Sequence, residues 1–273
     1  MAEIRIAFIG AGNMAASIIG GLVAEGHPAS TISASDPSPE SLARLREVAP
    51  VATGSDNREA VTGADVVILA VKPQVMARVC IDIAPALAGG GAVALSIAAG
   101  IPVASLERWL GPGVPVIRCM PNTPALLGAG ASGLYATAAV SAAQRAHAGT
   151  ILSAVGLVRW VDSEDDLHAV TAVSGSGPAY FFLFMEAMAA EGQRLGLDAE
   201  TATALTAQTC LGAARMAAES GIGLAELRRR VCSPGGTTER AIASFQSDEL
   251  EATVARAMTA CLARSKEMAD ELG

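Results

Sequence analysis

Two glycine-rich segments of the chain have the residue types of an anion-binding loop. Gly10, Gly12 and Ala15 follow a short apolar run and precede a helix-length segment. The second segment, CSPGGTTERA at 232–241, places small residues and two glycines at the start of another expected helix. Unpaired backbone N–H groups at the start of a helix attract negative charge. Each segment is therefore expected to bind an anion, although not the same one.

The first segment indicates a dinucleotide. Gly10 permits a tight turn, Gly12 lets the backbone approach a pyrophosphate, and Ala15 lets the helix pack close to the strand. We expect the pyrophosphate at the start of the helix 12–25. A GxGxxA pattern alone is weak evidence, but its place directly after the first strand of an α/β half favours dinucleotide binding over a purely structural turn.

The sequence does not decide whether that cofactor carries a 2′-phosphate. The second expected strand ends at Ser35 and Asp36, about where a residue that reads the adenosine ribose belongs. A carboxylate there would favour NAD(H), because it repels a 2′-phosphate. Asp36 also opens a turn in which Ser38 caps a helix and Pro39 takes its first position. In that case Asp36 points away, and Ser33 and Ser35 meet a phosphate instead.

Residues for acid–base catalysis are scarce. A reductase of alcohols or ketones normally needs a general acid or base near the reacting oxygen. His27, His147 and His168 have neither triad nor metal-ligand spacing, so no metal site is expected. Lys72 is either a cofactor contact or a surface cap on a strand end. A protonated C=N group accepts a hydride when it is merely held in place. The sequence therefore favours an imine substrate.

The elements that position these residues fall into two halves. Up to about Val161, short apolar runs alternate with helix-length segments, which predicts a parallel sheet covered on both faces. The expected strands are 4–9, 31–35, 65–71, 92–98, 114–120 and 157–161. After Asp162 only helices are expected, at 164–173, 178–195, 199–220, 224–230, 236–245 and 248–272. We predict an α/β, Rossmann-like, doubly wound domain at 1–162 and an all-α dimerisation domain at 163–273.

The expected helix 199–220 suggests why the second half dimerises. Alanine and glycine dominate several of its faces, so neighbouring backbones can approach closely. A helix that is apolar all round must be buried, and so few helices bury it poorly alone. We expect this half to pack against a second copy of itself. A self-sufficient helical bundle is the alternative.

Composition narrows the class of protein. A net charge of −8 disfavours nucleic acid as a partner, and the run Arg228–Arg230 is typical of a solvated helix face. The uncharged stretch between Arg118 and Arg145 is broken by proline and glycine, so we expect loop and sheet there and no membrane span. Five scattered cysteines indicate free thiols in a reducing compartment. With a strand expected at the start, no secretory signal is predicted, and the protein is expected to be cytoplasmic.

With these residues the chain resembles the pyrroline-5-carboxylate reductases over essentially its full length. The most specific segments are FIGAGNMA (8–15), VKPQ (71–74), RCMPNTPA (118–125), AVTAVSGSGPAYFF (169–182) and SPGGTTE (233–239). The resemblance implies reduction of 1-pyrroline-5-carboxylate to L-proline, the last step of proline biosynthesis, with NADP(H) or alternatively NAD(H). It also implies a homodimer through the helical domain, with a homodecamer (a pentamer of dimers) as a further possibility.

The resemblance assigns cofactor contacts by motif. It implies that the first loop binds the pyrophosphate, through Gly10, Gly12, Asn13, Met14 and Ala15. The adenosine ribose falls near Ser35 and Asn57, with Asp36 in the region that sets cofactor preference. The nicotinamide and its ribose are bordered by residues from three later segments: Val71, Lys72, Pro73, Ala98, Ala99, Met120 and Pro121.

The resemblance assigns the substrate to the second glycine-rich segment. Ser233, Gly236, Thr237 and Thr238 hold its carboxylate, and the Thr238 hydroxyl is the catalytic candidate, as a hydrogen-bonding group or proton relay at the ring nitrogen. Ser176 precedes a Gly-Pro break at which Pro178 should start a new helix, capped by Ser176 or Gly177. That break either lies beside the active site or is a structural kink. If the helical halves dimerise, the second loop can face the partner's cofactor.

Two other functions fit parts of the pattern. Another NAD(P)-dependent reductase of imines or hydroxy acids would share the first half, but hydroxy-acid dehydrogenases of this layout carry a catalytic lysine in the helical half. This chain has no lysine there before Lys266. A non-catalytic dinucleotide sensor would keep the fold, but its second anion-binding segment should be degraded. SPGGTTE is intact.

Overall fold

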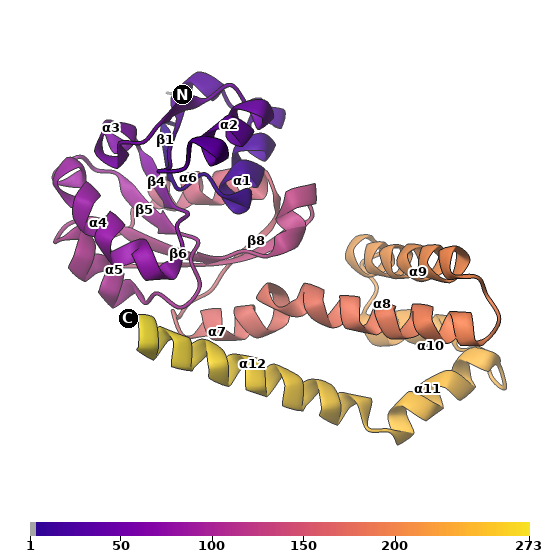
Figure 1. Ribbon diagram of the computed structural model, residues 1–273. Coiled ribbons are helices and arrows are strands. Elements are labelled where there is room, and N and C mark those ends of the chain that lie inside the picture. Colours follow the sequence, from indigo (N-terminus) through magenta and orange to yellow (C-terminus); the bar gives the residue numbers. More distant parts are fainter. Residues whose placement is uncertain (1–3) are drawn as a thin grey trace. The chain divides into compact units, whose positions relative to one another are not determined.

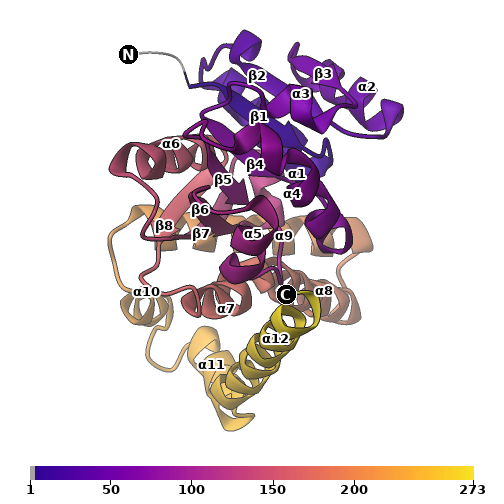
Figure 2. The same cartoon turned by 90° about the vertical axis from the view of Figure 1, so that its left-hand side faces the viewer.

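The computed structural model describes residues 4–273, which divide into two compact units. The α/β unit runs to Ser176 and takes in Cys261–Gly273, and the helical unit is Gly177–Ala260. Both units are drawn in Figures 1 and 2. The last helix begins in the helical unit and ends in the α/β unit. The predicted domain boundary between residues 162 and 163 follows the change from strand to helix, whereas the contacts keep the segment up to Ser176 with the sheet; that boundary stays a prediction.

The α/β unit is built on one eight-stranded sheet, in the order β3-β2-β1-β4-β5-β6-β7-β8. The strands are β1 Ile6–Ile9, β2 Ile32–Ser35, β3 Ala52–Gly54, β4 Val66–Leu69, β5 Val93–Ser96, β6 Val116–Met120, β7 Gly130–Ala136 and β8 Gly156–Trp160. β1 lies between β2 and β4, with Ile9 in register with Ser35 on one side and Leu69 on the other. The carboxyl ends of these three parallel strands therefore meet at one edge of the sheet.

The six expected strands all form, but the sheet is not wholly parallel. β7 runs antiparallel to β6, because the short helix η2 (Thr123–Leu127) between them is too short for a crossover. The alternation pattern missed β7, whose sequence GASGLYA lacks an apolar run, although it lies in the segment expected to form loop and sheet. It also missed β3, a three-residue strand at the sheet edge with little burial.

Helices cover both faces of the sheet and form two cores. Ile6 and Phe8 point to one face, where they join residues of α1 and α6, and Ala7 and Ile9 point to the other, where they join residues of α4 and α5. This two-sided burial confirms the doubly wound architecture. The helices of this part are α1 Asn13–Ala24, η1 Ala29–Thr31, α2 Pro39–Val48, α3 Asn57–Val61, α4 Pro73–Leu87, α5 Val103–Leu110 and α6 Ala142–Ser153.

No strand follows Trp160 in the described chain, as the sequence predicts. The helices are α7 Asp166–Val170, the π-helix η3 Thr171–Gly175, α8 Gly177–Arg194, α9 Ala199–Glu219, α10 Leu224–Val231, α11 Thr237–Ser247 and α12 Leu250–Leu272. The Gly-Pro break differs from the expectation. Helix α8 does start at Gly177, but Ser176 keeps helical backbone angles and ends the π-helix, so it does not cap α8.

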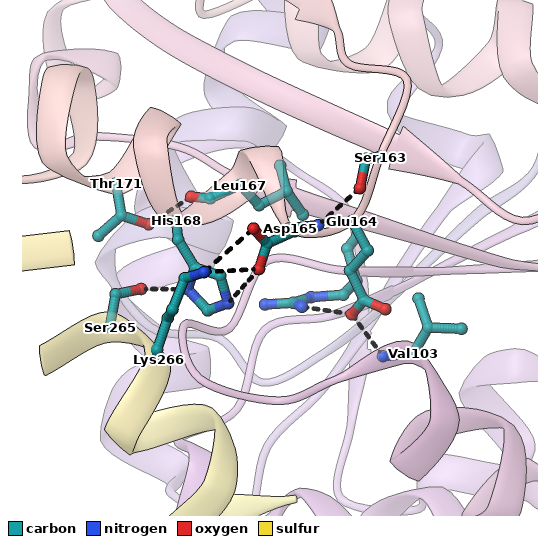
Figure 3. A network of polar contacts seen from close by, with 10 residues as sticks. Val103, Ser163, Glu164, Asp165, Leu167, His168, Thr171, Ser265 and Lys266 are labelled. Carbon is teal, nitrogen blue, oxygen red and sulfur yellow. Dashed lines mark hydrogen bonds and ion pairs between the residues drawn. The ribbon is translucent and has the colours of Figure 1, made fainter. Parts of the chain in front are cut away.

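A polar network joins α7 to the end of α12 within the α/β unit (Figure 3). His168 Nδ1 lies 2.8 Å from Ser265 Oγ, and Lys266 Nζ lies 3.1 Å from the Asp165 carboxylate. Beside it, the buried Arg118 of β6 pairs with Glu164, which also accepts the Val103 N–H at 2.8 Å. These contacts join the α7 region both to β6 and to the end of α12, which is about a hundred residues away in the sequence.

The helical unit buries little of its own apolar surface. On α9 only Ala202 and Thr206 are buried. Large apolar side chains remain exposed on both α8 and α9, among them Phe181 at 66% and Leu205 at 55%. The apolar α9 that the sequence indicates is thus present but uncovered within one chain. Arg229 and Arg230 of α10 are exposed and pair with Glu226, as expected for a solvated face.

Candidate active site

A cavity of about 690 Å³ opens at the carboxyl ends of β1, β2 and β4. This is the point where the strand order reverses direction, the usual ligand position in an open α/β sheet. The predicted cofactor residues on its wall are Gly10, Gly12, Ser35, Asp36, Asn57, Val71 and Lys72. Strand pairing brings these segments together, although they lie far apart in the chain.

The first glycine-rich loop has the geometry of a pyrophosphate site. Gly10 has φ +102°, and a Cβ at this position would lie 2.6 Å from the Ala70 carbonyl oxygen, so only glycine fits. Gly12 precedes α1, and a Cβ there would have no atom within 4 Å, because the residue faces the open cavity. Ala15 is fully buried against the core. The residues present therefore fit a dinucleotide phosphate at the start of α1.

Asp36 joins the loop to the turn after β2. Its Oδ2 accepts the Ala11 N–H at 2.8 Å, and its Oδ1 accepts the Ser38 N–H at 2.8 Å. Ser38 caps α2 by accepting the Ser41 N–H, and Pro39 takes the first helical position, as predicted. Both carboxylate oxygens thus have backbone donors within the chain, and the side chain supports the loop.

Ser35 and Asn57 contact each other. The Ser35 hydroxyl is fully buried and donates to Asn57 Oδ1 at 2.6 Å. The Asn57 amide in turn lies 3.4 Å from Asp82 Oδ2 on α4, and Asp82 is paired with Arg58 at 2.9 Å. Asn57 and Asp82 both line the cavity. Ser35 therefore orients Asn57, and Asn57 presents the polar surface at this end.

The motifs missed the part that α4 plays in this cavity. Val75, Arg78, Val79 and Asp82 line it from successive turns of the helix. Their spacing of three and four residues, read together with VKPQ at the helix start, is the signal that would have found them.

A second hollow, of about 310 Å³, continues from the first along the strand ends. Four predicted nicotinamide residues lie on its wall, namely Val71, Ala99, Met120 and Pro121. Met14, assigned by motif to the pyrophosphate, lines this hollow as well. Lys72 lines the larger cavity instead, Pro73 begins α4, and Ala98 is half-buried after β5. No residue described on the wall of this smaller hollow carries a titratable side chain.

Asn122 fastens this hollow to the π-helix. Its Nδ2 donates to the Ser174 carbonyl at 3.0 Å, and its Oδ1 accepts the Ala131 N–H at 2.8 Å. Gly175 packs so close that a Cβ there would lie 2.5 Å from the Met120 methyl group. The adjacent Ser176 is half-buried, and its hydroxyl lies 3.2 Å from Cys261 Sγ. π-Helical turns are frequent at functional sites, and this one forms part of the wall.

The second glycine-rich segment forms a tight turn before α11 in the helical unit. Gly235 has φ +72°, and the Gly236 N–H donates to the Ser233 carbonyl at 2.9 Å. Glu239 accepts the Gly235 N–H at 2.8 Å, a contact that the sequence motif did not reveal. Thr237 and Thr238 are the first residues of α11. Their backbone N–H groups lie in the first turn, where a helix offers no internal acceptor.

Two of the histidines and two of the cysteines lie in structural settings. His27 Nε2 contacts Thr31 Oγ1 at 2.9 Å, and burial lowers the pKa of His168 beside Ser265. Burial raises the pKa of the Cys80 and Cys119 thiols to about 12 each. Among residues 4–273, no three His, Cys, Asp or Glu side chains gather in a way that could hold a metal ion. None of the helices in that range is long and apolar enough to cross a membrane.

The fold and the cleft define a dinucleotide-binding α/β protein with an appended helical unit, and comparison with known proteins identifies its family. Residues 164–268 match the family model described as pyrroline-5-carboxylate reductase dimerisation, and residues 5–100 match the model described as coenzyme F420-dependent NADP oxidoreductase. The pyrroline-5-carboxylate reductase of Pseudomonas aeruginosa is 60% identical over 273 residues, which is 100% of both chains. The chain belongs to the pyrroline-5-carboxylate reductase family, which confirms the resemblance seen in its motifs.

Solved structures agree over the whole length. A pyrroline-5-carboxylate reductase from Coxiella burnetii has a TM-score of 0.95 at 44% identity, covering 98% of this chain and 99% of that one. The pyrroline carboxylate reductase of Plasmodium falciparum, solved with NADP bound, has a TM-score of 0.85 at 28% identity with the same coverage. These likenesses extend over both units of the chain.

Proposed function

We propose that this protein reduces 1-pyrroline-5-carboxylate to L-proline, the last step of proline biosynthesis, by hydride transfer from NAD(P)H to the C=N bond. The observation that carries the proposal is the smaller hollow, whose described wall is apolar or neutral and offers no general acid or base. A protonated imine needs positioning more than proton transfer, so such a site suits it. Relatives in the same family are named for reduction of this substrate.

The cofactor in this proposal is NADP(H), with NAD(H) as the alternative. Gly10, Gly12 and Asn13 bring backbone N–H groups and the helix dipole to the pyrophosphate, and Ala15 lets α1 start close to the sheet. Asn57, oriented by Ser35, faces the ribose, and Asp36 supports the loop rather than the ligand. When bound, the cofactor supplies the hydride. The Plasmodium falciparum relative binds NADP, which supports the choice of NADP(H).

The nicotinamide end is assigned to the smaller hollow. Its wall is largely apolar, with Met14, Val71, Ala99, Met120 and Pro121, and a bound nicotinamide ring would pack against it. Asn122 keeps Met120 and Pro121 in place through its two hydrogen bonds. Lys72, Pro73 and Ala98 remain proposed contacts at the border of this region.

The substrate carboxylate is assigned to the second glycine-rich turn. Ser233 and Gly236 shape the turn, and Thr237 and Thr238 offer N–H groups at the start of α11 together with two hydroxyls. In the proposal the Thr238 hydroxyl is the catalytic group, because it can hydrogen-bond the ring nitrogen as that atom changes charge. Ser176, one residue beyond the smaller hollow, is a further substrate contact.

The proposed site requires assembly. A helical unit that leaves Phe181 and Leu205 exposed supports a homodimer formed through that unit, and a pentamer of such dimers is the larger assembly we propose. In the dimer the substrate turn of one chain meets the nicotinamide hollow of its partner. The five free thiols support a reducing, cytoplasmic location.

One assay tests the reaction. Purified protein receives pyrroline-5-carboxylate with NADPH or with NADH, and consumption of the reduced cofactor is compared with proline formed. The expected result is one proline for each cofactor oxidised, with no oxidation when the substrate is left out. Failure to form proline with either cofactor, in protein that binds both, would reject the proposed function. Faster reduction of a keto acid to its hydroxy acid would instead favour the hydroxy-acid alternative.

A further inference from the structure

Four charged side chains line the larger cavity, and the two acidic ones already have hydrogen-bond or ion-pair partners. Asp36 accepts two backbone N–H groups, and Asp82 is paired with Arg58 and contacts Asn57. The other two are cations, Lys72 and Arg78. A cavity whose acids are satisfied and whose bases are not attracts an anion.

Neither cation has a partner within residues 4–273. Lys72 caps the start of α4 without a side-chain hydrogen bond there, and no ion pair, ring contact or side-chain hydrogen bond involves either side chain. Other exposed arginines of the same unit do have partners: Arg44 pairs with Glu40, and Arg58 with Asp82. An arginine left unpaired on a cavity wall is the exception in this unit.

The two cations stand at different ends of the cavity. Lys72 precedes α4, two residues after Ala70, whose carbonyl lies against the Gly10 turn. Arg78 lies six residues further along, about 9 Å at 1.5 Å per residue. It is one turn before Asp82, the residue that contacts Asn57. Arg78 therefore belongs to the ribose end, and Lys72 to the pyrophosphate end.

We propose that Arg78 selects the cofactor by binding the 2′-phosphate of its adenosine ribose. This rests on the proposed function only in that the cavity binds a nicotinamide dinucleotide. A guanidinium presents a planar set of donors that matches phosphate geometry. Selection then comes from α4 rather than from the end of β2, where the selecting residue of such folds usually stands. Asp36 occupies that usual position, but both of its carboxylate oxygens accept backbone N–H groups, from Ala11 and Ser38.

The neighbours of Arg78 fit this role. Val75 and Val79 give the same helix face an apolar surface for adenine, while the Asn57 amide, oriented by Ser35, is within reach of the ribose. Asp82 is neutralised by Arg58, so it does not compete strongly for the Arg78 guanidinium. Replacing Arg78 therefore removes the contact to the 2′-phosphate and leaves the other residues of the cavity wall unchanged.

The test is calorimetric titration of the purified protein with NADP⁺ and, separately, with NAD⁺. Arg78→Gln should weaken NADP⁺ binding by about tenfold or more while NAD⁺ changes by less than about twofold, since a charge-assisted phosphate contact is lost. Arg78→Lys should recover part of the loss. Arg44→Gln removes the same charge from an exposed position outside the cavity and should change neither affinity. Adenosine 2′,5′-bisphosphate should bind the wild type better than AMP, and that preference should disappear in Arg78→Gln.

Equal loss of NADP⁺ and NAD⁺ would overturn the proposal, because Arg78 would then contact a part shared by both cofactors. Unchanged affinity for both would overturn it as well. These binding results do not depend on catalysis. If the protein makes no proline but loses its preference for NADP⁺ in Arg78→Gln, this inference stands and the proposed function is rejected. If it makes proline but Arg78→Gln leaves the preference unchanged, the proposed function stands and this inference is rejected.

Discussion

The two units of the chain differ in how they bury apolar surface. In the α/β unit, alternate residues of each central strand enter one of two dense cores, and residues such as Phe8 and Ile68 are completely buried. In the helical unit, α8 and α9 pack together but leave phenylalanine and leucine side chains open to solvent. The first unit contains its own folding core. The second has a surface suited to another protein surface, and the family model matched there is one for dimerisation.

The two glycine-rich loops differ in the same way. Gly10 and Ala11 are held by Ser35 and Asp36, which come from a neighbouring strand and turn. Among residues 4–273, the hydrogen bonds that hold the turn before α11 come from its own segment, through Ser233 and Glu239. A loop fixed by long-range contacts is preorganised in one chain. A loop held by local contacts depends less on the rest of its own chain, and in the proposed dimer a second chain would complete its surroundings.

The largest expected effect comes from charging the exposed apolar surface of the helical unit. Phe181→Asp combined with Leu205→Asp should convert the dimer to monomer and reduce proline formation by about a hundredfold or more, because buried unpaired charges are costly at an interface. Light scattering after size-exclusion chromatography measures the mass. Val48→Asp with Leu126→Asp, at exposed positions of the α/β unit, should leave the dimer intact. A dimeric Phe181/Leu205 variant would show that this surface is not the interface.

The next effect separates the two glycines of the first loop. Gly10→Ala should lower the free energy of unfolding by about 2 kcal/mol or more, because it combines a positive φ with a clash against the Ala70 carbonyl. Gly12→Ala should leave that free energy within about 0.5 kcal/mol but weaken cofactor binding about tenfold, since the methyl enters only the open cavity. Urea titration and calorimetric titration measure the two quantities. A strongly destabilised Gly12→Ala protein would contradict this assignment.

A smaller effect is expected at the second loop. Thr238→Ala should lower kcat/KM for pyrroline-5-carboxylate by about tenfold while the cofactor Kd stays within about twofold, because only a substrate hydrogen bond is removed. Thr238→Ser keeps the hydroxyl and should recover most of the rate. Thr150→Ala, at an exposed position of α6 in the α/β unit, is the matched control. Equal loss of substrate and cofactor affinity would mean that Thr238 supports the cofactor site.

The smallest effect concerns pH and the α7–α12 network. Burial lowers the pKa of His168, Asp165 opposes this, and Arg118 and Lys266 add to the lowering. The folded protein therefore resists protonation below about pH 6.5, where the unfolded chain accepts a proton, so stability falls as pH drops from about 6.5 toward the lower folded pKa. His168→Gln should flatten the decrease of Tm between about pH 7 and pH 5. His147→Gln should not, and an unchanged slope in His168→Gln would assign the pH dependence elsewhere.

Much of the α/β unit was predictable from short-range patterns. Apolar runs revealed six strands because strands buried on both faces need continuous apolar residues, and Ser38 with Pro39 marked a helix start. The pattern missed β7 because its burial comes from neighbours on both sides rather than from large side chains. For the site, the motifs indicated Gly10, Gly12 and Asn57. The turn signal at residues 36–40 correctly offered the alternative that Asp36 points away from the ribose, but nothing in the sequence showed that its carboxylate also accepts the Ala11 N–H.

The sequence by itself determined the class of fold, the first loop and the shortage of acid–base residues, since these follow from local periodicity and residue type. Only the tertiary structure decided which charges are free. Whether Asp36 or Arg78 can meet a phosphate depends on backbone donors and ion pairs supplied by other segments, such as Ala11 and Arg58. Electrostatic roles are set by all neighbours in space, and a linear motif contains only the neighbours in sequence.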